Sequence, residues 1–348
     1  MNQLYSNKFS NNMPIITDIK KAPSLFVERV NQGLPYKPLS VKLKIIDKCN
    51  LRCMMCNHWR RDVNALPYGF YLPVIKDLAE LGCRRIHFTG GEPLLYPNLL
   101  LLMDYIKQCD CNIKISMTTN ATLIDDNMAK ALAQSGLTKA NISIDSPEES
   151  LHDTIRGVPG AFNKACHGFQ CLKKYMPQRS FYLNTVLSPW NYRTLIGLPK
   201  LAKELGAAGI HLMTLNVHTD EASPFTSSQL DVLKTDVLPA LLDEAKRYDI
   251  PLEIPQLSSD AYYYSHRCYA LFSHLLINCL GFVYPCCNLM ETPIGDLHHN
   301  SIKEIWECKN YRELRKKQTL PIDSTCVTCD LFLENNKQIE ELFFRTTN

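Results

Sequence analysis

The sequence predicts an α/β protein built on a parallel sheet, either open or closed into a barrel. Three observations support this fold class. Six apolar runs have the length of buried strands, helical segments alternate with them, and several of those segments end in glycine. The predicted strands are VKLKII (41–46), RRIHF (84–88), NIKISMT (112–118), ANISI (140–144), FYLNTVL (181–187) and GIHLM (209–213).

A helix–glycine–strand plan occurs three times, at 78–88, 132–144 and 201–213. The glycine of each, Gly82, Gly136 or Gly206, is expected to end its helix in the left-handed conformation. The segment before the last of these supports a helix, because Leu198, Leu201, Ala202 and Leu205 share one helical face.

The whole chain has the composition of an ordinary globular protein. Its 348 residues suggest about two domains, with 45% hydrophobic and 21% charged residues and a net charge of +3. That small charge argues against nucleic acid or a membrane surface as the main partner. The apolar run LLLLM (99–103) is far shorter than the ~20 residues that span a bilayer. The polar N-terminus shows no signal-peptide pattern, so we expect a cytoplasmic protein.

Fifteen cysteines are a high number for this length, and their clustering favours metal or iron–sulfur sites over disulfides. Cys49, Cys53 and Cys56 follow the first predicted strand with the spacing C-x3-C-x2-C. Three thiols leave a metal site with one open position, although a partial zinc site is an alternative. Four more cysteines near the other end are Cys268, Cys286, Cys326 and Cys329, for which a zinc ribbon is the simpler alternative. Most of the remaining cysteines are expected to be small buried hydrophobic residues.

Four distinctive motifs follow the first four predicted strands. They are CNLRCMMC (49–56), TGGEP (89–93), TTN (118–120) and SIDS (143–146). Because chemistry in parallel α/β folds lies at the carboxyl ends of the strands, all four should meet on one rim. Gly90 and Gly91 allow close approach of the backbone, and Glu92 offers a carboxylate to an ammonium group. Arg156 is suited to hold a carboxylate as a bidentate fork.

In their order on this framework, CNLRCMMC, FTGGEP, MTTN and SIDS resemble the radical S-adenosylmethionine (radical SAM) superfamily over roughly residues 40–215. The resemblance implies a partial (β/α)6 barrel of TIM type with a [4Fe–4S] cluster on Cys49, Cys53 and Cys56. The fourth iron would chelate S-adenosylmethionine. Reduction would cleave this cofactor to methionine and a 5′-deoxyadenosyl radical that abstracts a hydrogen atom from substrate.

The same resemblance implies contacts with S-adenosylmethionine. It places Gly91 and its neighbours Gly90 and Glu92 at the methionine amine, Ser143 and Arg156 at the carboxylate and ribose, and Leu215 at the adenine. Asn120 is expected to line the same pocket. Met55 departs from the family pattern, which usually has an aromatic residue before the third cysteine. A thioether makes a similar soft contact.

The C-terminal cysteines, in the pattern C-x12-G-x4-C with a distal CVTC, resemble the radical SAM extension called the twitch, a shortened SPASM domain. Residues 294–315 fit its strand, turn and tryptophan-bearing helix. The resemblance implies one auxiliary [4Fe–4S] cluster on Cys268, Cys286, Cys326 and Cys329, which would serve as an electron conduit. Cys287 is an alternative to Cys286. His298 and His299 are expected to form a solvated turn before a helix, and Tyr262–Tyr264 to pack in the core.

We therefore expect an N-terminal extension (1–37), a radical SAM partial barrel (38–250), and a small cysteine-rich α+β auxiliary-cluster domain with a C-terminal helix (251–348). The expected function is hydrogen abstraction from a small polar metabolite such as an aminocyclitol, sugar or nucleoside. The expected reaction is a dehydrogenation or related radical modification by an oxidoreductase with a flavodoxin- or ferredoxin-type electron donor. The alternative is modification of a ribosomally synthesised peptide by epimerisation, crosslinking or oxidation. A remote alternative is a non-catalytic zinc or electron-transfer protein.

Overall fold

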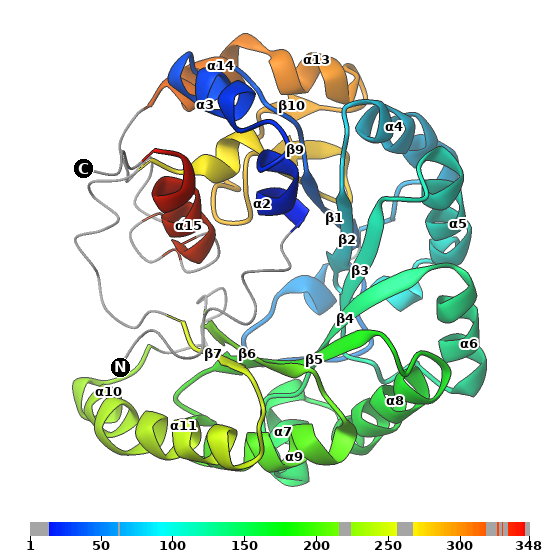
Figure 1. Cartoon of the computed structure of the whole chain (residues 1–348). Helices are drawn as coiled ribbons and strands as arrows, with labels where there is room; N and C mark the ends of the chain where they lie inside the picture. The colour runs from blue at the N-terminus through cyan, green and yellow to red at the C-terminus, as the bar shows by residue number, and fades with distance from the viewer. Residues whose placement is uncertain are drawn as a thin grey trace.

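One curved sheet of ten strands organises the chain (Figure 1). The computed structural model describes residues 14–61, 63–215, 224–255, 267–317 and 333–344, together with Cys326 and Cys329. The sheet has the order β10-β9-β8-β1-β2-β3-β4-β5-β6-β7. Its strands are β1 (Ser40–Ile46), β2 (Arg85–Gly90), β3 (Lys114–Thr119), β4 (Leu137–Ser143), β5 (Ser180–Leu187), β6 (Gly209–Thr214), β7 (Leu252–Glu253), β8 (His274–Ile277), β9 (Phe282–Tyr284) and β10 (Gly295–Asp296).

The eight strands from β8 through β1 to β7 are parallel, and β9 and β10 continue the sheet in antiparallel fashion. Figure 1 shows the sheet as an arc that does not close. The predicted partial barrel with a C-terminal α+β part is confirmed. The strands of that C-terminal part join the barrel sheet, because β8 pairs directly with β1.

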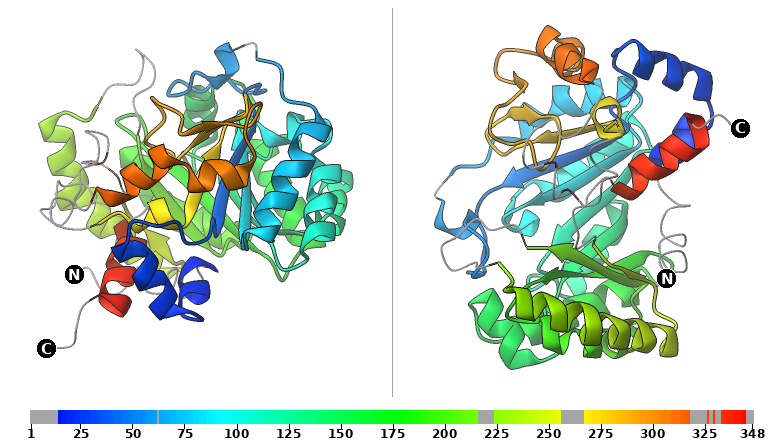
Figure 2. Two further views of the ribbon diagram at one scale, coloured as in Figure 1. Left: turned by 90° about the horizontal axis from the view of Figure 1, so that it is seen from above. Right: turned by 90° about the vertical axis from the view of Figure 1, so that its left-hand side faces the viewer.

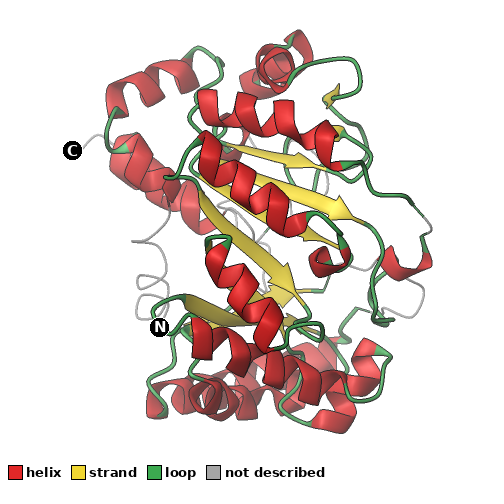
Figure 3. Cartoon of the chain, turned by 90° about the vertical axis from the view of Figure 1, so that its right-hand side faces the viewer, coloured by secondary structure: helices red, strands yellow, loops and turns green. Residues whose placement is uncertain are grey.

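Helices cover the outer face of the arc (Figure 3). The α-helices are α2 (Pro14–Ile19), α3 (Pro23–Asn31), α4 (Tyr68–Glu80), α5 (Leu99–Cys109), α6 (Asp126–Gln134), α7 (Glu149–Arg156), α8 (Ala161–Tyr175), α9 (Leu198–Leu205), α10 (Ser227–Val232), α11 (Leu238–Arg247), α13 (Ile302–Glu307), α14 (Lys309–Lys316) and α15 (Leu333–Phe343). Short helices of other types are η1 (His58–Arg60), η2 (Pro93–Leu95), η3 (Tyr192–Gly197), η4 (Leu233–Val237) and η5 (Tyr269–Phe272).

The main core lies between these helices and the outward side chains of the sheet. Each central strand sends its apolar residues outward at alternate positions, as a half-buried strand does. Examples are Leu43, Phe88, Met117, Ile142 and Leu183, all of them buried. The opposite side chains line the concave inner face and are mostly polar, so the barrel has a dry outer layer and a polar interior surface.

All six predicted strands are present, with ends that differ by a few residues from the prediction. The three helix-ending glycines have positive φ values of 83°, 85° and 68°, as expected. Strands β7 to β9 escaped prediction because they are two to four residues long, too short for a periodic pattern, whereas β10 lies in the strand expected at the start of residues 294–315.

The N-terminal and C-terminal helices pack together beside the barrel (Figure 2). The Phe26 ring of α3 lies 6.3 Å from the Phe343 ring of α15 and 6.2 Å from Tyr269. Asp18 of α2 forms an ion pair with Arg84 at 2.8 Å, next to the start of β2. Within the described chain, no helix has the length and apolar character to cross a bilayer. The tyrosines at 262–264 lie outside the described residues.

Candidate active site

The three N-terminal cysteines lie on a loop, residues 47–58, that we call the cysteine loop. Its first part is held against the end of β2. The Gly91 amide donates to the Ile46 carbonyl at 2.7 Å, and the Glu92 amide donates to the Lys48 carbonyl at 2.9 Å. A Cβ atom at Gly91 would lie 2.1 Å from the Lys48 oxygen, and one at Gly90 equally close to the Ile46 oxygen. Only glycine permits this contact, so the GG pair fixes where the loop begins.

The middle of the cysteine loop is held from the other side by the end of α7. The Arg52 amide donates to the Arg156 carbonyl and the Met54 amide to the Ile155 carbonyl, both at 3.0 Å. Gly157 follows with a φ of 69°, and a Cβ there would lie 2.4 Å from the Arg52 oxygen. The loop is thus clamped between segments more than sixty residues apart in sequence.

A third anchor comes from the end of β3. The Asn120 side-chain amide donates to Asn50 Oδ1 at 2.9 Å and lies 3.9 Å from Cys49 Sγ. Asn50 in turn donates to the Thr122 hydroxyl at 2.8 Å. Asn120 therefore supports the loop directly. Sequence reasoning missed Asn50 and Thr122, which carry no signal beyond their nearness to the motifs.

Hydrogen-bond donors surround the three sulfur atoms. The amides of Leu51 and His58 lie 3.4 and 3.5 Å from the sulfurs of Cys49 and Cys56. Arg156 Nη1 lies 3.7 Å from Cys53 Sγ. Burial raises the pKa of Cys49 to about 11 and also raises that of Cys53, so free thiols stay protonated at neutral pH. The donors favour thiolates once metal replaces those protons, which fits an iron–sulfur cluster.

Arg156 is buried and forms an ion pair with Asp145, with 2.8 Å between Nε and Oδ2. Asp145 Oδ1 also accepts the Val186 amide at 3.0 Å, and His152 accepts the Asp145 amide at 3.2 Å. The Arg156 guanidinium, which was predicted to bind a ligand carboxylate, thus already faces Asp145 and Cys53. An acidic residue at the end of an apolar strand, in SIDS, was the available sequence signal for Asp145.

Glu92 is buried and turns its carboxylate toward the protein. It accepts bonds from the Thr119 hydroxyl at 2.7 Å, the Asn120 amide at 2.8 Å and the Leu94 amide at 3.2 Å. Burial raises its pKa to about 6, although these bonds oppose the shift. We expected the Glu92 carboxylate to bind an ammonium group of the ligand. In the structure it instead links the ends of β2 and β3 through these hydrogen bonds.

A small apolar cluster, separate from the main core, lies beside the cysteines. Met55 and Leu51 are buried in it with Cys53, and Leu215 and Trp190 pack against it. The predicted residues Met55 and Leu215 are thus brought together. Trp190 is an addition that sequence reasoning missed. Ser143 is buried at the end of β4, level with Asn184 of β5, on the inner face.

The C-terminal cysteines approach one another in part. The thiol of Cys268 lies within electrostatic range of both Cys326 and Cys286. The Cys329 amide donates to the Cys326 carbonyl at 3.2 Å, which places that pair on one turn. Cys287 lies within electrostatic range of Lys44 and Arg85 on the inner face. Cys286 therefore lies near Cys268.

A site for a single metal ion is not formed by any three His, Cys, Asp or Glu side chains in the described ranges. A cubane cluster differs from such a site because each thiolate binds a different iron atom. His298 and His299 flank Asp296 on the surface, and Ser301 caps α13 with a capping box. The expected turn before a helix is confirmed.

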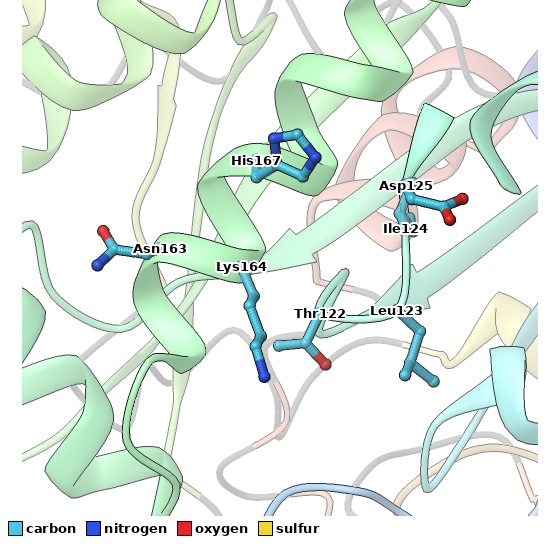
Figure 4. Close-up of a pocket in the computed structure, with 7 residues that line it drawn as sticks. All are labelled: Thr122, Leu123, Ile124, Asp125, Asn163, Lys164 and His167. Atoms are coloured by element: carbon cyan, nitrogen blue, oxygen red, sulfur yellow. The ribbon is translucent and has the colours of Figure 1, made fainter. Parts of the chain in front are cut away.

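A surface hollow lies between the loop after β3 and α8 and adjoins the cysteine loop only through Thr122 (Figure 4). It is lined by Thr122, Leu123, Ile124, Asp125, Asn163, Lys164 and His167. No predicted site residue lines it, and Asp125 already caps α6. We assign it no function.

Comparison with known proteins agrees with this geometry. The radical SAM superfamily profile matches residues 43–202, and the iron–sulfur cluster-binding SPASM domain matches residues 268–330. The chain belongs to the radical SAM superfamily. As a radical SAM protein with a SPASM domain, it uses S-adenosylmethionine and iron–sulfur clusters.

Two kinds of curated relative are similar to this radical SAM protein. An AdoMet-dependent heme synthase of Methanosarcina barkeri is 26% identical over 320 residues, which cover 84% of this chain and 88% of the relative. A GTP 3′,8-cyclase of Clostridium botulinum is 34% identical over 155 residues, which cover 42% of this chain and 47% of the relative.

Solved radical SAM structures share the fold. Streptococcus suis SuiB bound to S-adenosylmethionine superposes with a TM-score of 0.68 at 17% identity, covering 95% of this chain and 79% of SuiB. AdoMet-bound anSMEcpe superposes with a TM-score of 0.63 at 22% identity, covering 85% of this chain and 87% of that structure. At such identities the likeness concerns the fold alone.

Proposed function

We propose that this radical SAM enzyme abstracts a hydrogen atom from a small polar metabolite of the aminocyclitol, sugar or nucleoside type, in a net oxidation. The observation that carries the chemistry is the cysteine loop, clamped on three sides with donors at its sulfurs. When bound, the reduced cluster and S-adenosylmethionine would together supply the 5′-deoxyadenosyl radical for this abstraction, and the residues of the chain would hold them in place.

The protein residues position these groups. Cys49, Cys53 and Cys56 would hold the first cluster, and Arg156 would stabilise the Cys53 thiolate through its charge. Gly90 and Gly91 would present their backbone to the methionine part, and their lack of a Cβ lets the chain before the cysteines lie against them.

On the remaining sides of the ligand, Ser143 and Asn120 would present polar atoms to it. Met55 and Leu215 would offer the adenine an apolar surface. Glu92 would not contact the ligand; it would hold the Asn120 backbone in place by accepting its amide hydrogen bond.

The C-terminal cysteines Cys268, Cys286, Cys326 and Cys329 would hold one auxiliary cluster. Four thiolates leave no iron open to substrate, which favours electron transfer to or from the substrate radical and a flavodoxin- or ferredoxin-type partner. Small-molecule chemistry is supported by the names of the relatives, a heme synthase and a GTP cyclase. A peptide substrate is the alternative outcome of the test.

The test is formation of 5′-deoxyadenosine by anaerobically reconstituted, reduced enzyme with low- and high-molecular-weight fractions of an extract from the source organism. Stimulation by the small fraction supports the proposal. Stimulation by the large fraction alone replaces it with a peptide or carrier-bound substrate. Absence of cleavage with both clusters assembled would refute the catalytic assignment.

Iron content tests the ligands independently of activity. The wild type should hold roughly eight irons, and Cys53→Ala or Cys286→Ala roughly four. Cys111→Ala, at an exposed cysteine outside both sets, is the matched control and should keep roughly eight. Bound zinc in place of iron would contradict both cluster assignments.

A further inference from the structure

The inner face of the sheet carries an unusual concentration of positive charge. Lys42 of β1, His87 of β2, Ser116 of β3 and Lys139 of β4 are aligned across four neighbouring strands. Arg85 lies two residues before His87 on the same face of β2. We call Lys42, Arg85, His87 and Lys139 the basic floor.

The three cations of the basic floor all lie within electrostatic range of the His87 ring. Adjacent strands are about 4.8 Å apart, so the backbones of Lys42 and Lys139 are about 14 Å apart, with His87 between them. The Lys139 ammonium lies 4.1 Å from the Tyr182 ring centre. His87 bonds to the Ser116 hydroxyl at 2.9 Å, which holds its ring between the cations.

The described part of the chain supplies little negative charge to balance this group. No described carboxylate lies within 4 Å of Lys42, Arg85 or Lys139, although each is only partly exposed. Glu253 lies within electrostatic range of Lys139, and its carboxylate is bound to His211 at 2.5 Å. Arg85 bonds to the Ser40 hydroxyl at 3.1 Å, a neutral partner.

The pKa values agree with a positive potential on this face. Burial, and then the repulsion of Arg85, lower the pKa of Lys139 to about 8. Burial, together with Lys42, Arg85 and Lys139, holds the pKa of His87 well below its usual range. Such a group of half-buried like charges is unfavourable for folding, and residues of this kind are retained where function needs them.

The basic floor faces the candidate active site along the strands. Lys139 and Ser143 are four residues apart on β4, a rise of about 13 Å at 3.3 Å per residue. Between them lies Asn141, whose buried Oδ1 has no hydrogen-bond partner among the described residues. A ligand can thus have one end at the cysteines and the other at the floor.

We propose that the basic floor binds an anionic group, a carboxylate or phosphate, of the substrate, and so holds its reacting carbon toward the rim that carries Ser143. This inference rests on the proposed function for the identity of the ligand as substrate. The distance selects a metabolite about 10–13 Å long, with its charge at one end. Asn141 would bond to a polar group in the middle of that molecule.

A first experiment measures the floor without the natural substrate. Lysines of the holoenzyme are labelled with trace acetic anhydride, with and without inorganic pyrophosphate or citrate, and the peptides are quantified. Either anion at about 10 mM should slow labelling of Lys42 and Lys139 at least fivefold, because millimolar binding then occupies most sites. Lys200, exposed on α9, is the control and should be unaffected. Protection by neither anion would overturn the proposal.

A second experiment uses substrate-stimulated 5′-deoxyadenosine formation. The stimulating small molecules should be retained on an anion-exchange column, and Lys139→Gln should raise their half-stimulating concentration about tenfold to a hundredfold, as loss of a charged hydrogen bond does. Lys139→Arg should restore most of the affinity, and Lys200→Gln should behave as the wild type.

The outcomes separate this inference from the proposed function. Loss of stimulation after phosphatase treatment assigns a phosphate, and loss after methyl esterification assigns a carboxylate. Stimulation by the unretained fraction, unchanged in Lys139→Gln, would refute the anionic substrate while radical chemistry stands. If no S-adenosylmethionine is cleaved at all, the proposed function fails, and the labelling result still decides whether the floor binds anions.

Discussion

The ion pair between Arg156 and Asp145 should be among the most sensitive points of the fold. At 2.8 Å and an effective dielectric constant of about 20, the two charges attract each other by about 6 kcal/mol, much of which offsets the cost of burying them. The variant Arg156→Gln leaves the fully buried Asp145 carboxylate without its cation. We therefore expect the free energy of unfolding to fall by about 3–5 kcal/mol.

A matched control is available on the surface. Lys174 and Asp126 form an ion pair at 2.9 Å, nearly the same distance, with both side chains more than half exposed. Lys174→Gln should change stability very little, because water screens such a pair. Urea unfolding of the metal-free proteins under anaerobic, reducing conditions gives both numbers.

A double variant separates the pair from its surroundings. Arg156→Gln combined with Asp145→Asn removes both charges and should recover part of the loss, since no buried charge is left unpaired. If Arg156→Gln and Lys174→Gln lowered the free energy of unfolding by the same amount, the view that the buried pair holds the cysteine loop would be refuted.

Three further predictions follow from the same structure. Gly91→Ala places a Cβ 2.1 Å from a carbonyl oxygen of the cysteine loop and should lose roughly four of roughly eight irons. Gly69→Ala, where nothing lies within 4 Å, should lose none in the same iron assay. Glu92→Gln places an amide donor against the Thr119 hydroxyl and the Asn120 backbone amide, which are themselves donors. The free energy of unfolding, measured in urea, should therefore fall by about 1–3 kcal/mol. Lys139→Met should stabilise the ligand-free protein by up to about 3 kcal/mol at pH 7, since its folded pKa of about 8 is below the ordinary 10.5. The gain should shrink as pH rises from about 8 to about 11, above which the wild-type lysine is mostly neutral in both the folded and unfolded states. A pH-independent difference between the two melting curves would contradict this reasoning.

The sequence by itself predicted the six strands β1 to β6 and the motifs that make up the candidate site. The six strands β1 to β6 show as apolar runs because a central parallel strand must bury its outward side chains, and that requirement is local. The cysteine spacing and the GG pair are likewise local patterns, which can be recognised from a few consecutive residues of the sequence. Gly91 must be glycine because of a contact that its own motif makes with the preceding loop.

Only the tertiary structure decided which distant charges meet. Arg156 reads in sequence as a free ligand-binding group, and the fold turns it to Asp145 and Cys53. The basic floor joins Lys42 to Lys139 across nearly one hundred residues. Its members share a surface only because strand register sets which side chains lie level, and register depends on pairing between strands. The pairing of β8 with β1, which adds β8 to the barrel sheet, is equally non-local, so no local pattern in the sequence predicted it.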